Sequence, residues 1–117
     1  MQCAAIGVSL PAMNLNQAAR CLEKLGNPIR LEVFRLLVRA GHEGLPVGEI
    51  QDHLGIPAST LSHHIGHLVN AGLVVQEREG RQLICRPDFA LMDGLIGFLT
   101  EECCMLSGKP EAPRDAG

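Results

Sequence analysis

Apolar residues recur every three or four positions along most of the chain, which is the spacing of one helix face. Asn14, Asn27 and Asp88 are suitable helix caps, and Pro28 fits a first helical turn. The pattern predicts helices over about residues 14–24, 27–41, 47–54, 58–71 and 88–104.

Residues 73–86 have a different pattern, in which apolar runs flank the turn signal Glu79-Gly80. This segment predicts a β-hairpin between the fourth and fifth helices. The order of elements predicts a mainly α fold, a winged helix-turn-helix in which the hairpin is the wing. We expect one domain over residues 14–104, an irregular N-terminus over 1–13 and a disordered tail over 105–117.

The third and fourth predicted helices are joined by a short turn over residues 55–58, as in a helix-turn-helix. The second helix of such a motif reads base edges in the major groove, so its first turns need small or polar side chains. The hairpin tip carries two arginines that suit contact with the DNA backbone or a minor groove. The predicted DNA contacts are Ser59, Thr60, Ser62, His63, His64, His67, Arg78 and Arg81.

The histidines of this helix have a second interpretation. His63 and His67 lie one helical turn apart, which is a spacing that metal ligands use, and His64 lies beside them. A metal ion there would occupy the surface that reads DNA. We therefore favour DNA contact over metal binding for the three histidines.

Charge and composition limit the partner. The 117 residues carry a net charge of −3, but residues 1–87 have eight Lys and Arg against seven Asp and Glu, so the acidic excess lies in residues 88–117. With three Phe and no Trp or Tyr, stacking on single-stranded nucleic acid is disfavoured, and the predicted partner is double-stranded DNA. An interaction domain that does not read DNA stays an alternative, which the net charge alone favours.

Several classes of protein are disfavoured. No apolar run approaches the roughly 20 residues of a membrane span. A signal peptide begins with basic residues, but the first basic residue here is Arg20. We therefore expect no membrane partner and a cytoplasmic location. The sequence shows no nucleophile–base signature and no phosphate-binding loop, so we expect no enzyme activity.

Four stretches form a specific combination when taken together. They are LGNPIRL at residues 25–31, STLSHHI at 59–65, AGLV at 71–74 and REGR at 78–81. The combination resembles the ArsR/SmtB family of metalloregulatory repressors over about residues 15–104. The resemblance implies a transcriptional repressor of operator DNA, a homodimer built from the first and last helices, and one recognition helix for each half-site.

The inducer that this resemblance implies depends on where the family's ligands fall. Arsenic sensors of the family carry two Cys at the start of the helix-turn-helix, but residues 49–53 hold none. Zinc sensors carry an Asp-x-His pair on the last helix, but residues 93–95 lack the His, so no zinc is expected. The remaining Cys85, Cys103 and Cys104 resemble the arsenic-responsive branch with ligands on the last helix. That branch implies release by trivalent arsenic, either arsenite or methylarsenite.

Sulfur chemistry fits this inducer, since trivalent arsenic is soft and prefers thiolates. Arsenite accepts three thiolates, and a monomethyl arsenical accepts two. Cys85 and Cys103 are separated by a helix of roughly 25 Å, so one straight chain cannot bring them to one ion. We therefore expect two symmetric sites across the dimer interface, unless the helix ends early and the tail folds back. Neighbouring helix residues point about 100° apart, so the participation of Cys104 stays open.

Other interpretations of the cysteines also stay open. Five Cys without a secretion signal indicate reduced thiols rather than a disulfide framework. Cys85 is also suited to a core-facing strand position, Cys21 is expected in the core, and Cys3 has no expected role. The alternative function is a redox or persulfide-responsive repressor, in which Cys103 or Cys104 is oxidised and a second Cys resolves it.

Overall fold

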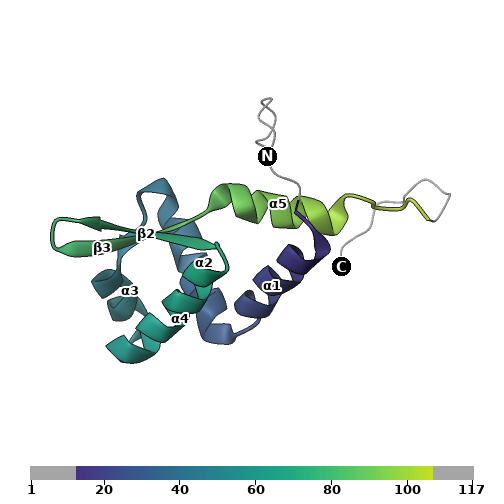
Figure 1. Ribbon diagram of the computed structural model, residues 1–117. Helices are drawn as coiled ribbons and strands as arrows, with labels where there is room; N and C mark the ends of the chain where they lie inside the picture. The colour runs from purple at the N-terminus through teal and green to yellow at the C-terminus, as the bar shows by residue number, and fades with distance from the viewer. Residues whose placement is uncertain (1–12, 107–117) are drawn as a thin grey trace.

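The computed structural model describes residues 13–106. In chain order the elements are α1 (Leu15–Leu25), α2 (Pro28–Ala40), the 3-10 helix η2 (Gly41–Glu43), β1 (Leu45–Pro46), α3 (Val47–Leu54), α4 (Ala58–Asn70), β2 (Val74–Glu79), β3 (Gln82–Pro87) and α5 (Phe89–Thr100). This order confirms the predicted winged helix-turn-helix (Figure 1). The expectations for Cys3, for the N-terminus up to residue 12 and for the tail from residue 107 lie outside the described residues.

The caps expected from the sequence start the first two helices. The Asn14 side chain accepts a hydrogen bond from the backbone N–H of Gln17 at 2.8 Å, and the Gln17 side chain accepts one from the N–H of Asn14 at 3.0 Å. Asn27 accepts from the N–H groups of Ile29 at 2.9 Å and Arg30 at 3.2 Å. These side chains satisfy N–H groups that have no partner inside a helix. The first four helices accordingly match the predicted bounds to within one residue.

The last helix is shorter than predicted. We expected it to end near Cys104, but α5 ends at Thr100 and residues 101–106 form turns. The next two residues are Glu101 and Glu102, whose negative charges are unfavourable at the negative end of a helix dipole. The cysteines that follow therefore lie beyond the helix rather than on it.

The wing belongs to a three-stranded sheet. The strand order is β1–β3–β2, and both pairs are antiparallel. The β2–β3 hairpin is confirmed, but β1 was not predicted, because two residues carry no periodic signal. Leu45 of β1 lies opposite Cys85 of β3, and Pro46 lies opposite Ile84. This pairing holds the base of the wing against the start of α3.

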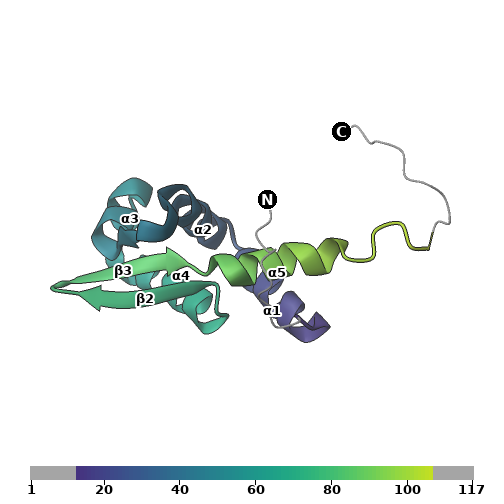
Figure 2. The ribbon, with the colours of Figure 1, turned by 90° about the horizontal axis from the view of Figure 1, so that it is seen from above.

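The core lies between the helices and the sheet. Leu37, Ile50, Leu61 and Leu73 are fully buried in it, and Cys21 is buried as predicted. α1 and α5 contact each other at one end of the molecule, and the β2–β3 turn lies at the opposite end (Figures 1 and 2). Within the described residues, no helix has both the length and the apolar character that crossing a membrane requires.

Candidate DNA-binding surface and thiol site

The recognition helix α4 separates a polar face from a buried apolar face. Gly55 ends α3 in the left-handed region, with φ +67°, where glycine is unstrained, and this turns the chain toward α4. Ser59, Ser62 and His63 are exposed, and Thr60 is half-buried beside them. The buried face consists of Leu61, Ile65 and Leu68. The first two turns of α4 therefore offer small and polar groups, as reading of base edges requires.

His64 is a correction to the predicted contact set. Only 9% of this residue is exposed, because it lies three positions after Leu61 and four before Leu68, on the buried face of α4. Its Nδ1 atom faces Nη1 of Arg30 at 3.5 Å. Burial first, and then the positive charge of Arg30, lower the pKa of His64. This side chain connects α4 to α2 and does not lie on the exposed reading face.

His67 lies half-buried in the last turn of α4. Its Nδ1 atom accepts a hydrogen bond from Nζ of Lys24, at the end of α1, over 3.1 Å. Its ring meets the ring of His63 edge-on, with centroids 4.6 Å apart. Sequence reasoning missed Lys24, because nothing local signals a contact between residues 43 positions apart. Within residues 13–106, no three His, Cys, Asp or Glu side chains converge as metal ligands do.

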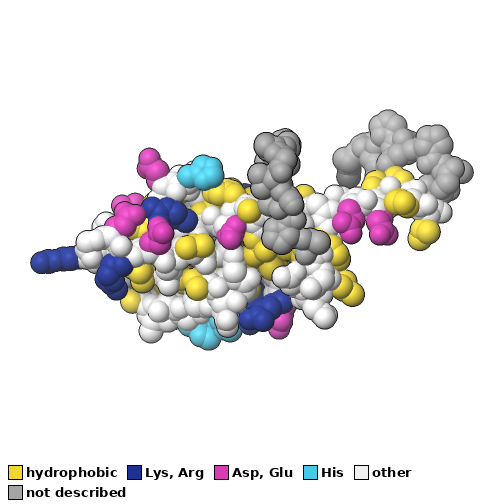
Figure 3. Space-filling model, turned by 45° about the horizontal axis from the view of Figure 1, so that its top comes forward, with side chains coloured by type: hydrophobic (Ala, Val, Ile, Leu, Met, Phe, Trp, Pro, Cys, Tyr) yellow, Lys and Arg dark blue, Asp and Glu magenta, His cyan; other side chains and the backbone are white. Residues whose placement is uncertain are grey.

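The wing exposes Arg78 and Arg81 on either side of the Gly80 turn. The acidic residues of β2 are paired elsewhere, since Arg86 forms ion pairs with both Glu77 and Glu79. Arg86 also donates to the backbone carbonyl oxygen of His42 at 3.1 Å, which ties the wing to η2. Figure 3 shows Lys and Arg side chains projecting from the wing end of the molecule. The tip therefore offers positive charge suited to phosphate contact.

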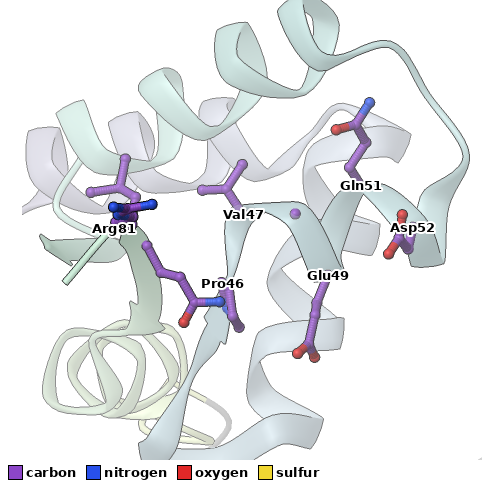
Figure 4. Close-up of a pocket in the computed structure, with 9 residues that line it drawn as sticks. Pro46, Val47, Glu49, Gln51, Asp52 and Arg81 are labelled. Carbon is purple, nitrogen blue, oxygen red and sulfur yellow. The ribbon is translucent and has the colours of Figure 1, made fainter. Parts of the chain in front are cut away.

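A hollow of about 500 Å³ separates the start of α3 from the wing (Figure 4). Its lining includes Glu49 and Asp52 of α3 and Arg81 of the wing. The thiol ligands of some arsenic sensors would fall in this part of α3. The hollow offers carboxylates instead of sulfur, and carboxylates are poor ligands for a thiophilic inducer.

Cys85 is fully buried in the middle of the sheet. It lies on β3 between Leu45 of β1 and Gln76 of β2, and the Gln76 side-chain amide approaches its Sγ atom at 3.5 Å. Burial raises the pKa of the Cys85 thiol, since it disfavours the thiolate. Within one protomer, Cys85 is thus a core residue that no ligand from solvent reaches.

Cys103 and Cys104 are exposed and follow the end of α5. Their Sγ atoms lie 3.1 Å apart, against about 2.05 Å in a disulfide. Cys104 has φ +66°, so the backbone here is not helical and the divergence expected of helix neighbours does not apply. The structure therefore brings Cys103 and Cys104 together. The twelve residues of α5, a length of about 18 Å, separate this pair from the strand that carries Cys85.

Comparison with known proteins identifies the domain. The helix-turn-helix domain family matches residues 25–77. The chain is 34% identical over 89 residues to the biofilm growth-associated repressor of Xylella fastidiosa, covering 76% of this chain and 75% of that protein. The structure is also similar to the homodimeric winged helix-turn-helix domain Mb0332 of Mycobacterium bovis, which is described as a possible ArsR-family transcriptional regulator. The TM-score is 0.59 at 28% identity, and the match covers 85% of this chain and 90% of that one. The chain belongs to the ArsR/SmtB-type winged-helix transcriptional regulators.

Two further proteins are similar to this ArsR-type regulator. It is 33% identical over 86 residues to the HTH-type transcriptional regulator NmtR of Mycobacterium tuberculosis, covering 74% of this chain and 66% of that protein. A structure described as a possible transcriptional regulator for arsenical resistance has a TM-score of 0.58 at 25% identity, covering 84% of this chain and all of that one. Such proteins bind DNA and are not enzymes. The matched domain contains the recognition helix, whereas Cys85, Cys103 and Cys104 all lie beyond it.

The positions of the cysteines in this ArsR-type regulator predict their reactivity. At neutral pH, iodoacetamide should modify Cys103 and Cys104 at least tenfold faster than Cys85 and Cys21. The first two are exposed, whereas burial raises the pKa of the other two and keeps them as thiols. Timed alkylation followed by peptide mass spectrometry gives the four rates. In guanidinium chloride the rates should converge, and modification of Cys85 as fast as Cys103 in the native protein would contradict this placement.

Proposed function

We propose that this regulator is a repressor that binds operator DNA as a homodimer and releases it when a trivalent arsenical binds Cys103 and Cys104. The observation that carries DNA recognition is the exposed set Ser59, Ser62 and His63 on the first turns of α4. Hydroxyl and imidazole groups donate to and accept from base edges in the major groove. A related protein is named a repressor, which favours this direction of control.

A dimer explains the apolar surface of the terminal helices. Leu15 of α1 is 71% exposed, and Ile96 and Leu99 of α5 are 54% and 57% exposed. Large apolar side chains gathered on two adjacent helices favour burial against another chain. The related Mb0332 domain is homodimeric. Pairing at this end leaves both wings at the outer ends and gives the dimer one recognition helix for each half-site of an operator (Figure 1).

The proposed inducer follows from the donor set. Two thiols with sulfurs 3.1 Å apart form a chelating pair for a soft ion that accepts two thiolates. A monosubstituted trivalent arsenical, such as methylarsenite, keeps its carbon and accepts two. A structurally similar protein is described in connection with arsenical resistance. These points favour the organic form over arsenite, which needs a third thiolate.

Cys85 is the candidate for that third thiolate. It is buried within its own protomer, so it joins a site only if the sheet opens or if the partner protomer's Cys103 and Cys104 approach β3. We therefore assign Cys85 to arsenite alone and the Cys103–Cys104 pair to both forms.

Release needs coupling between the thiol pair and the DNA surface. The pair directly follows α5, the helix that we place in the dimer interface. A ligand that binds more tightly to one dimer arrangement shifts the population toward it. About 1–3 kcal/mol of coupling weakens DNA binding by roughly 5- to 150-fold.

The test is fluorescence anisotropy of the protein on its own promoter fragment. Each protein is titrated with four compounds, which are phenylarsine oxide, arsenite, zinc and a persulfide donor. The proteins are wild type, Cys103→Ser, Cys104→Ser and, as a control, Cys85→Ala. Phenylarsine oxide should release DNA from wild type and from Cys85→Ala, and both serine variants should stay bound. Arsenite should lose potency with all three variants.

Other outcomes separate the alternatives. If only the persulfide donor or an oxidant releases DNA, and dithiothreitol restores binding, the thiols sense sulfur or redox state and the arsenical assignment is wrong. If wild type binds promoter and unrelated DNA equally weakly, with no loss on adding salt, the domain does not act through DNA.

A further inference from the structure

A group of basic side chains extends the DNA-facing side of the molecule beyond the reading face of α4. Lys24 at the end of α1 and Arg30 in the first turn of α2 lie beside His67 of α4. The Nζ atom of Lys24 lies 3.1 Å from Nδ1 of His67. The guanidinium of Arg30 is oriented by the Lys24 carbonyl oxygen, to which Nε donates at 2.6 Å. Two helices that are separate in sequence, α1 and α2, therefore bring positive charge to a histidine of α4.

No carboxylate in the described part of the chain compensates the charges of this group. Among residues 13–106, the ion pairs are those of Arg86 on the wing, and no carboxylate pairs with Lys24 or Arg30. Lys24, Arg30 and His67 are half-buried, so their side chains face solvent in part. A cluster of donors without a counter-ion is a suitable site for an anion.

We propose that Lys24, Arg30 and His67 bind a phosphate of the DNA backbone, and that binding is accompanied by uptake of one proton on His67 in each protomer. The inference rests on the proposed DNA-binding function and adds a contact and a pH dependence to it. The position of the group beside the reading face of α4 makes the DNA backbone the source of the phosphate, because backbone strands border the groove that α4 enters.

The hydrogen bond from Lys24 determines the protonation state without DNA. An ammonium group has only donors, so Nδ1 of His67 must offer a lone pair and the ring must be neutral. When a phosphate binds, Lys24 can donate to its oxygens instead, and Nδ1 then takes a proton from solvent. The resulting imidazolium donates to the same anion, so negative charge and added proton stabilise each other.

The direction of the pH dependence follows from the groups around His67. Desolvation, and then the charges of Lys24 and Arg30 with the neighbouring His63 and His64, lower the pKa of His67 in the protein without DNA. A phosphate has the opposite charge and raises that pKa. Between the two pKa values the complex holds more protons than the separate partners, so by linkage the affinity rises as pH falls.

The experiment measures dissociation constants on the promoter fragment and on an unrelated duplex of equal length, between about pH 6 and 8 and over a range of salt. Lys24→Gln removes the proposed phosphate donor. His67→Gln keeps an acceptor for Lys24 but cannot take up a proton. Arg39→Gln, an exposed charge at the other end of α2, is the matched control. Thermal melting confirms that each variant is folded.

We expect wild type and Arg39→Gln to bind both duplexes several times more tightly at the lower pH. Lys24→Gln should weaken binding to both and reduce the salt slope by about one per protomer. His67→Gln should keep the salt slope at the higher pH and lose most of the pH dependence. The inference is overturned if Lys24→Gln matches Arg39→Gln in salt slope, or if His67→Gln keeps the pH dependence of wild type. Failure of promoter recognition is distinct, because it appears as equal affinity of wild type for the two duplexes.

Discussion

Replacing Ser62 and His63 together by alanine is expected to reduce the preference of this regulator for its own promoter over unrelated DNA by on the order of a hundredfold. Both residues are exposed on the first turns of α4, where the helix of a helix-turn-helix meets base edges. Loss of a base contact costs about 1–3 kcal/mol, and a dimer loses it in both half-sites.

Competition anisotropy with the promoter fragment and an unrelated duplex measures this preference. Affinity for the unrelated duplex should change little, because Arg78 and Arg81 and the backbone contacts remain. The melting temperature should stay close to wild type, since substitutions of exposed residues usually change stability by less than about 0.5 kcal/mol. A variant that keeps the wild-type preference would show that α4 does not read the bases through these side chains.

Gly44→Ala is expected to lower the free energy of unfolding by about 2–4 kcal/mol. Gly44 has φ +71°, a conformation that side chains with a Cβ rarely adopt. A Cβ atom here would lie 2.7 Å from Cγ of Arg86 and closer still to the carbonyl oxygen of Cys85. The carbonyl belongs to the backbone of β3 and cannot move without disturbing the β1–β3 pairing.

Gly41→Ala is the matched control for this prediction. Gly41 has φ +83°, but a Cβ atom there meets nothing within 4 Å. Its cost is therefore the backbone strain alone, about 1–3 kcal/mol. Urea denaturation at one protein concentration compares the two variants, because the stability of a dimer depends on concentration. An equal loss of stability in both variants would mean that the close approach of residue 44 to β3 adds nothing to the cost of the substitution.

The sequence determined the parts of this protein that depend on local interactions. Helix periodicity and the caps Asn14 and Asn27 predicted the first four helices to within one residue, because a helix depends on contacts between residues three or four apart. The turn signal at Glu79-Gly80 predicted the hairpin for the same reason. The polar start of α4 predicted an exposed polar face, which the structure forms with Ser59, Ser62 and His63.

Tertiary structure decided what depends on distant parts of the chain. It paired β1 with β3, and it ended α5 before Cys103, so that two thiols which would diverge on a helix lie in contact. It also buried His64 against Arg30 and placed Lys24 beside His67. Each of these contacts except the thiol pair joins residues more than thirty positions apart. No local pattern encodes such contacts, because packing of the whole domain selects which surfaces meet.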